Sequence, residues 1–205
     1  MIVIAGRVLS MDDALSKLNY YPLKTLYRYD LPGPGDPRVL TREELIRTRA
    51  LRSRISNAEL NWFLDRASSA PWPSPDADLR QADPGVVGGL YDWMLTLYDH
   101  FTSAAPSGIA MAKISKVLHL KRPAAYPILD RKITSTYRHA AGQAALRYPG
   151  QGYKRMYWAA IRRDLITNTE SGALAALRRS LDGNGHFHDL SRVTDLRLQD
   201  MLTWR

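Results

Sequence analysis

The chain has 205 residues, of which 45% are hydrophobic and 24% charged, and this composition is typical of a globular protein with one sizeable core. It has 29 Lys and Arg residues against 20 Asp and Glu, so its formal charge of +9 favours a polyanionic partner such as nucleic acid. The absence of cysteine excludes disulfides, cysteine-ligated zinc, iron–sulfur clusters and thiol catalysis.

No stretch of the sequence reaches the roughly 18 apolar residues that a membrane helix needs. Arg7 interrupts the short apolar N-terminus, so neither a signal-peptide core nor a cleavage site is visible. We therefore expect a soluble, basic protein of the cytoplasm. Nucleic-acid binding, a structural role and catalysis all remain open at this point.

Helix-start signals are frequent in the first third of the chain. Ser10 followed by Asp13 predicts a helix that ends before Pro22, and at most a minor strand is expected near residues 1–8. Residues 30–37 hold three prolines and two glycines in eight positions, which predicts a loop. Two capping boxes, Thr41 with Glu44 and Ser56 with Glu59, predict the next two helices.

A Pro- and Asp-rich stretch at residues 70–84 predicts an irregular segment. We expect an N-terminal helical portion over 1–70, a linker-like loop over 71–89 and a second helical portion over 90–205, packed as one compact unit. Helical spacing of apolar residues recurs through this second portion. The predicted helices cover residues 90–101, 114–120, 130 onward, 153–166, 173–181 and 193–204. The predicted fold class is mainly α.

The most informative stretch is residues 107–137, SGIAMAKISKVLHLKRPAAYPILDRKITSTY. It predicts a glycine-containing turn, a basic apolar helix, a proline-bounded loop, and an Asp at the start of another helix. A turn and a helix N-terminus can both approach a phosphate group. Six cations surround this segment: Lys113, Lys116, Lys121, Arg122, Arg131 and Lys132. A basic, solvated helix face with no ligand is the alternative interpretation.

This stretch resembles the helix-hairpin-helix element of the base-excision DNA glycosylases. Gly108-Ile109-Ala110 lies where that family has its hairpin, with Ala110 in place of the second glycine, and Pro127-Ile128-Leu129-Asp130 resembles the segment that carries the family's Asp. The resemblance covers about thirty residues. Most of the chain is similar to the domain of unknown function 6308 family, through residues 116–133, an early TREELIRTRALRSRISNAE segment and the terminal DLRLQDMLTWR.

The glycosylase resemblance implies a DNA-binding site and a catalytic carboxylate. The implied DNA contacts come from Gly108, Ala110 and the six cations named above, and the implied carboxylate is Asp130. Cleavage of an N-glycosidic bond builds positive charge on the sugar, which a carboxylate stabilises while it positions or deprotonates water. Asp is also a preferred N-cap, so Asp130 could equally be structural.

Bifunctional members of that family use a lysine nucleophile, and the ungapped alignment places Ala112 at its position. Lys113 is the next residue, rotated by about 100° around the helix, so we expect it to face phosphate instead of sugar. A monofunctional hydrolase that uses Asp130 and water is therefore favoured. Lys113 is the alternative nucleophile if the hairpin register differs.

Removal of a base from the stack needs aromatic side chains around the extruded base. The candidates for a base pocket are Trp93, Tyr126, Tyr137, Tyr157 and Trp158. Helical aromatic residues also fill protein cores, and this is the alternative for each of them.

His186 and His188 with Asp189 form a weak candidate metal cluster, and a loop is the favoured interpretation. We predict no metal and no cofactor. The predicted function is a DNA N-glycosylase of DNA repair, acting on duplex DNA as a monomer. The alternatives are a non-catalytic helix-hairpin-helix DNA-binding protein and an interaction protein with an acidic partner. The recognised base is not specified by the sequence.

Overall fold

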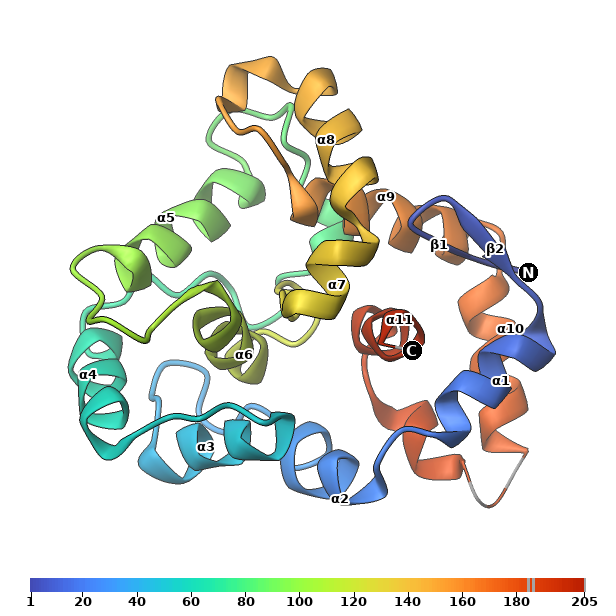
Figure 1. Ribbon diagram of the computed structural model, residues 1–205, viewed down its shortest axis with the longest axis horizontal. Coiled ribbons are helices and arrows are strands. Elements are labelled where there is room, and N and C mark those ends of the chain that lie inside the picture. Colours follow the sequence, from blue (N-terminus) through green and yellow to red (C-terminus); the bar gives the residue numbers. More distant parts are fainter. Residues whose placement is uncertain (184, 186, 205) are drawn as a thin grey trace. The chain divides into compact units, whose positions relative to one another are not determined.

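The computed structural model describes residues 1–183, 185 and 187–204, and helices dominate this part of the chain (Figure 1). A two-stranded antiparallel hairpin of β1 (Ile2–Ile4) and β2 (Arg7–Leu9) is the only sheet among the described residues. The α-helices are α1 (Met11–Asn19), α2 (Leu23–Thr25), α3 (Arg42–Arg47), α4 (Asn57–Ala67), α5 (Leu90–Thr102), α6 (Met111–Lys121), α7 (Arg131–Thr136), α8 (Arg138–Arg147), α9 (Tyr157–Glu170), α10 (Ala173–Asp182) and α11 (Asp195–Thr203). The prediction of a mainly helical fold with a minor strand at the N-terminus is confirmed.

None of the described helices is both long enough and apolar enough to cross a membrane.

The chain divides into two compact units. Unit 1 combines Met1–Pro22 with Arg131–Arg205, and unit 2 is the intervening Leu23–Asp130. These units do not coincide with the predicted portions 1–70 and 90–205, because segment 71–89 lies inside unit 2. Two hydrogen bonds attach that segment to residues near the end of α6, from Leu79 N to Ala124 O (2.9 Å) and from Arg122 Nε to Pro73 O (2.8 Å).

The predicted helix starts in the first third are confirmed. Ser10 Oγ accepts a hydrogen bond from Asp13 N at 3.0 Å and caps α1. The capping boxes of Thr41 on α3 and Ser56 on α4 are both complete. In each, the N-cap hydroxyl accepts a hydrogen bond from the N3 amide, and the N3 glutamate side chain accepts one from the N-cap amide. The predicted loop is irregular over residues 31–37, and its first residue, Asp30, ends a short π-helix, Leu26–Asp30.

In unit 1 the hairpin is tied to α9 by polar side chains. Asn168 accepts a hydrogen bond from Val3 N (2.7 Å) and donates one to Val3 O (2.8 Å), and Asp164 accepts one from Ala5 N. Ala5 has φ +52°, and Gly6 beside it has φ +78°, so the hairpin turns through two left-handed residues. The aliphatic side chains of α10 and α11 supply much of the core of this unit.

In unit 2 the helices α4, α5 and α6 pack around aromatic side chains. Phe63 of α4 and Phe101 of α5 are fully buried, with ring centroids 5.9 Å apart. Tyr126 is also fully buried, and its hydroxyl donates to Met94 O of α5 at 3.0 Å. This packing holds α5 and α6 as the two arms of a helical hairpin, which is the element that the sequence singles out.

Candidate nucleic-acid interface

The turn between α5 and α6 has the backbone that its sequence predicts. Gly108 is exposed and has φ +98°, a conformation that glycine adopts at no steric cost. Ala110 is the N-cap of α6, and its carbonyl accepts the amides of Lys113 (2.9 Å) and Ile114 (3.2 Å). Because alanine has no side-chain acceptor, the first amides of α6 receive no cap from the N-cap side chain. Residues 90–121 therefore form a helix, a glycine turn and a second helix.

Polar contacts hold the segment between α6 and Asp130 against α6. His119 Nδ1 lies 2.7 Å from Tyr126 O, and Leu129 N donates to Ser115 Oγ at 3.0 Å. Both His119 and Ser115 are buried on α6. These contacts fix the backbone leading to Asp130, which is half-buried and directly precedes α7. His119 thus holds the backbone of this segment from the interior of the unit.

Three of the cations expected at a phosphate surface lie in the interior of unit 2. Lys116, Lys121 and Arg122 are 8%, 1% and 1% exposed. Lys116 Nζ donates to Leu51 O at 2.9 Å, and Lys121 Nζ forms an ion pair of 2.8 Å with Glu44 Oε1. Their position corrects the prediction that all six cations line the surface, and we assign these three to the fold.

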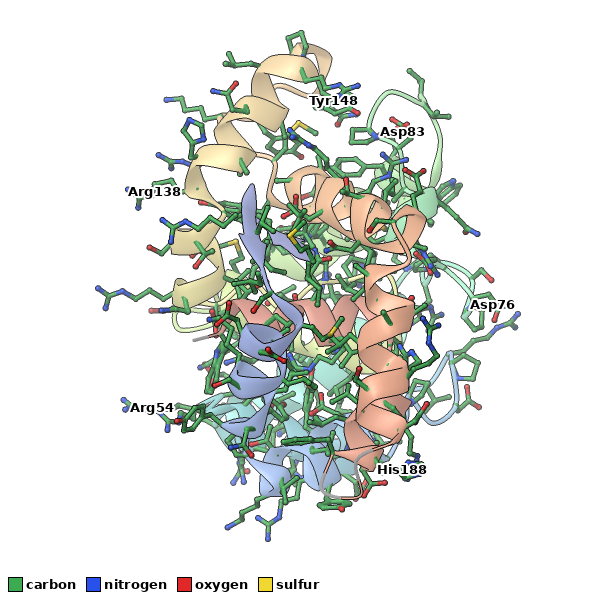
Figure 2. All side chains as sticks on the ribbon, turned by 90° about the vertical axis from the view of Figure 1, so that its right-hand side faces the viewer. Arg54, Asp76, Asp83, Arg138, Tyr148 and His188 are labelled. Atoms are coloured by element: carbon green, nitrogen blue, oxygen red, sulfur yellow. The ribbon has the colours of Figure 1, made fainter. Side chains whose placement is uncertain are left out.

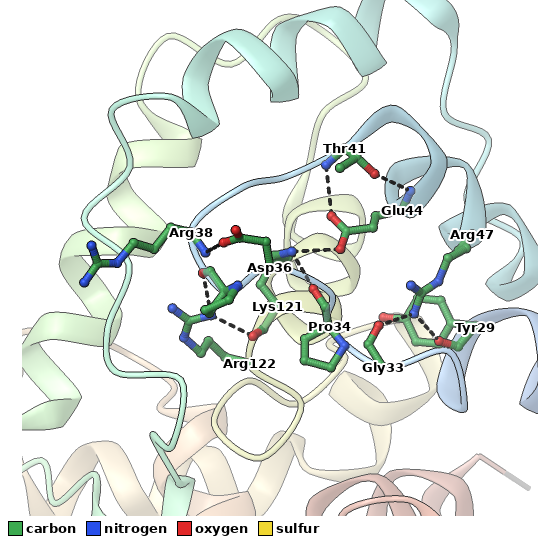
Figure 3. Close-up of polar contacts among 11 residues, drawn as sticks. Tyr29, Gly33, Pro34, Asp36, Arg38, Thr41, Glu44, Arg47, Lys121 and Arg122 are labelled. Atoms are coloured by element: carbon green, nitrogen blue, oxygen red, sulfur yellow. Dashed lines mark hydrogen bonds and ion pairs between the residues drawn. The ribbon is translucent and has the colours of Figure 1, made fainter.

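The buried cations satisfy the backbone of the proline-rich loop, as Figure 3 shows. Lys121 donates to Pro34 O and Arg122 to Pro37 O, while Arg47 of α3 donates to Gly33 O at 2.8 Å. Proline residues have no amide hydrogen, so this loop cannot satisfy its own carbonyls with a regular ladder. The cations supply the missing donors from α3 and from the end of α6.

The remaining predicted cations are nearer to solvent. Arg131 and Lys132, in the first turn of α7, are exposed. Lys113 is partly exposed and pairs with Glu59 Oε1 of α4 at 2.5 Å. Further exposed cations outside the predicted set include Arg54 and Arg138, whose side chains extend away from the ribbon (Figure 2).

Positive charge also gathers where α1 meets α7 within unit 1. Partial burial lowers the pKa of Lys17, repulsion from Lys132 lowers it further, and Asp13 partly opposes both effects. Lys17 of α1 is therefore near enough to Lys132 of α7 for their charges to interact. Sequence reasoning missed Lys17, because nothing in the linear spacing brings α1 beside α7.

The five candidate base-pocket residues fall into two groups. Tyr126, Tyr137 and Trp158 are at most 6% exposed and serve the cores of their units. Burial raises the pKa of the Tyr126 and Tyr137 hydroxyls, and Asp164 raises that of Tyr137 further. Trp93, on α5, is 56% exposed, and Tyr157 at the start of α9 is half-buried. Of the five, these two are accessible to a ligand.

A buried polar network in unit 1 was not foreseen from the sequence. Gln199 Nε2 donates to Tyr137 Oη (3.3 Å) and to Ile161 O (3.0 Å), and Asn168 Nδ2 donates to Gln199 Oε1 (3.2 Å). These polar residues lie at helical spacings otherwise filled by apolar side chains. The network joins α9 and α11 to Tyr137, the residue between α7 and α8.

His186 of the weak metal cluster lies outside the described residues. Its neighbour His188 places Nδ1 3.7 Å from Asp182 Oδ1, and both side chains are at least half exposed. In the part of the chain that the structure describes, no three His, Asp or Glu side chains gather as metal ligands would.

The family of unknown function DUF6308 has a model that matches residues 33–205. The match covers most of unit 2 and the C-terminal part of unit 1. Searches of curated proteins and of solved structures found no match to this chain.

Proposed function

The chain belongs to the DUF6308 family of unknown function, and we propose that it binds duplex DNA and hydrolyses the N-glycosidic bond of a damaged or modified base. In this proposal Asp130 is the central carboxylate. The helix–turn–helix of α5 and α6 approaches the DNA backbone through Gly108 and Ala110. Lys113, Arg131 and Lys132 contact phosphates, and the exposed Trp93 of α5 is the aromatic residue available to an extruded base in the same unit as Asp130.

One observation carries the proposal: the order helix, glycine turn, helix, anchored irregular segment, Asp, helix. Gly108 supplies the left-handed turn, and Ser115 and His119 hold the following chain on α6, so the backbone that leads to Asp130 has a fixed place relative to α6. The same order of parts underlies the resemblance to the helix-hairpin-helix DNA glycosylases. Asp130 itself is half-buried and not fully enclosed, which the proposed role requires.

The chemistry assigned to Asp130 is electrostatic and basic. A carboxylate below the sugar ring would stabilise the developing oxocarbenium ion, and it would accept a proton from the water that attacks the sugar carbon. The base leaves with the bonding electron pair and an intact abasic strand remains. Lys113 is not needed as a nucleophile in this mechanism, and its pairing with Glu59 suits a role other than covalent catalysis.

The test is base release from a panel of duplexes that each carry one modified base, comparing the wild-type protein with Asp130→Asn. Asn caps helices about as well as Asp, so folding and duplex binding should persist. Loss of the charge should slow base release about 100-fold or more. Asp65→Asn on α4 is the matched control, because it removes an equal charge from an exposed position.

The product distinguishes the mechanisms. We expect strands that break only after alkali or heat, and no protein–DNA adduct on treatment with borohydride. A trapped adduct that disappears in Lys113→Ala would assign the nucleophile to Lys113. Duplex binding without base release from any duplex would favour the non-catalytic DNA-binding protein. Undiminished release by Asp130→Asn would leave Asp130 as a structural residue and would assign the chemistry to another group.

A further inference from the structure

Lys113, a cation of the proposed DNA surface, is neutralised within the protein. Its Nζ lies 2.5 Å from Glu59 Oε1, and the two residues are 54 positions apart in the sequence. Their side chains are 19% and 12% exposed. In the free protein, therefore, Lys113 presents an ion pair to solvent instead of a bare ammonium group.

The carboxylate of Glu59 lies against the turn as well as against Lys113. Oε1 is 3.0 Å from the position that a Cβ on Gly108 would occupy. The other oxygen, Oε2, accepts a hydrogen bond from Ser56 N at 2.7 Å and completes the capping box of α4. An anion is thus held beside Gly108 and Lys113, where the proposed function requires a phosphate.

Glu59 keeps its negative charge in this place. Burial alone would raise its pKa, but the hydrogen bonds from Lys113 and Ser56 together with the charge of Lys113 outweigh it, so the pKa of Glu59 lies below its ordinary value. The carboxylate therefore persists at neutral pH and competes with any other anion for Lys113.

A second pair on α6 shows what a permanently structural arrangement looks like in this protein. Glu44, the N3 residue of the other capping box, pairs with Lys121 at side-chain exposures of 9% and 0%, and Lys121 also donates to Pro34 O. Two successive capping-box glutamates thus reach two lysines on one helix. The two carboxylates are similarly buried, but the side chain of Lys113 is 19% exposed whereas that of Lys121 is 0% exposed, so an incoming anion can reach Lys113 and not Lys121.

We propose that Glu59 is an autoinhibitory counter-ion of the DNA surface. Its carboxylate occupies the place of a backbone phosphate beside Gly108 and Lys113, and duplex binding displaces it. This inference rests on the proposed function, whose phosphate contact at Lys113 it regulates. The displaced Glu59 side chain can turn toward solvent while the N–H of Ser56 is left to water.

The first experiment measures duplex affinity at low salt for the wild-type protein, Glu59→Gln and Glu43→Gln. Gln is accepted at the N3 position of a capping box, so Glu59→Gln retains the start of α4 while it removes the charge. Glu43→Gln removes an equal charge from an exposed position on α3. We expect Glu59→Gln to bind about threefold to tenfold more tightly than wild type, and Glu43→Gln to differ from wild type by less than about twofold.

The second experiment uses inorganic phosphate as the probe and the amide resonance of Gly108 in nuclear magnetic resonance spectra as the readout. The Gly108 resonance should move at a lower phosphate concentration in Glu59→Gln than in wild type or Glu43→Gln. This readout does not depend on DNA binding. It therefore separates the displaced-anion inference from the proposed function.

The possible results are distinct. Equal effects of Glu59→Gln and Glu43→Gln on both probes would overturn the inference, even if all three proteins bind duplex DNA. Phosphate binding at a lower concentration by Glu59→Gln, without duplex binding by any of the proteins, would support the inference that Glu59 competes with an anion. It would contradict the proposed function. Tighter binding of both probes by Glu59→Gln alone would support both.

Discussion

Asp164 of α9 places a carboxyl group in the interior of unit 1. Asp164 is only 5% exposed, and one of its carboxylate oxygens accepts a hydrogen bond from the backbone amide of Ala5. Burial raises the pKa of Asp164, and the hydrogen bonds from Ala5 and Tyr137 with the charge of Arg163 only partly offset this. The ionised form of Asp164 is therefore less favourable in the folded protein than in the unfolded chain.

This raised pKa makes a prediction about stability and pH. A carboxyl group with a raised folded-state pKa contributes its stabilisation below the unfolded pKa of about 3.9 and loses it as the pH rises through the folded value. The free energy of unfolding of the wild-type protein minus that of Asp164→Asn should thus be larger near pH 4 than near pH 7. Urea unfolding of both proteins at several pH values measures the difference.

The Asp65→Asn variant is the control for this measurement, because Asp65 is exposed. Glu59 should show the opposite sign, since its pKa is lowered: its contribution is present above the unfolded pKa and is lost as the pH falls through the folded one. A wild-type protein that gains stability over Asp164→Asn as the pH rises would contradict the assigned burial of this charge.

The proline-rich loop shows where reading charge from a sequence fails. The sequence correctly predicts a loop at residues 30–37, because proline and glycine disfavour regular structure there. It does not reveal that Lys121 and Arg122, at the end of α6, satisfy this loop's carbonyl groups (Figure 3). A lysine in a linear motif looks the same whether it faces a phosphate or a buried carbonyl, and only the packing of distant segments decides between them.

Lys121→Met tests the structural role of this contact. The substitution leaves the carboxylate of Glu44 in an interior position without its ion-pair partner, and breaking a buried pair in this way costs about 3 kcal/mol or more. We expect a loss of that size in the free energy of unfolding, measured with urea. Lys24→Met, at an exposed position of α2, should change it by less than about 0.5 kcal/mol.

Partial recovery in the double variant Lys121→Met with Glu44→Gln would show that the unpaired carboxylate causes the loss. A Lys121→Met protein as stable as wild type would contradict the structural role of Lys121 and would restore it as a candidate phosphate contact.

Helix starts were well predicted where a side chain caps the helix and less well elsewhere. Thr41 and Ser56 make the capping boxes that their spacing predicts. In contrast, α9 begins at Tyr157, four residues after the predicted start at 153. Gly152 has φ +72°, and Met156 N donates to Ala141 O of α8, so the intervening residues are held by a tertiary contact instead of a helical one. Periodicity alone cannot detect such a contact.

The division of the chain into two units was not visible in the sequence. Segment 71–89 has the composition of a linker, yet Arg122 and Ala124 bond its backbone into unit 2. The boundaries between the two units, after Pro22 and after Asp130, fall outside the stretch of linker composition. Composition reports the lack of regular structure, whereas unit boundaries depend on which segments pack together.

The candidate site was predicted in part. The sequence located the α5–α6 turn and placed Asp130 at the start of a helix, because glycine and Asp have strong local preferences. It could not separate the surface cations Arg131 and Lys132 from the buried Lys116, or find the pairing of Lys113 with Glu59. Those distinctions depend on contacts between residues far apart in the sequence.

Duplex binding is the property on which both the proposed activity and the role of Glu59 depend, and its salt dependence tests it most directly. Each phosphate that the protein neutralises should contribute about −0.9 to the slope of log affinity against log salt concentration. We predict a slope that corresponds to several phosphates. The double variant Arg131→Ala with Lys132→Ala should reduce this slope by about two phosphate contacts. A duplex with an uncharged backbone should not bind. Affinity that does not change with salt, or equal affinity for the uncharged duplex, would contradict the proposal that this chain binds DNA.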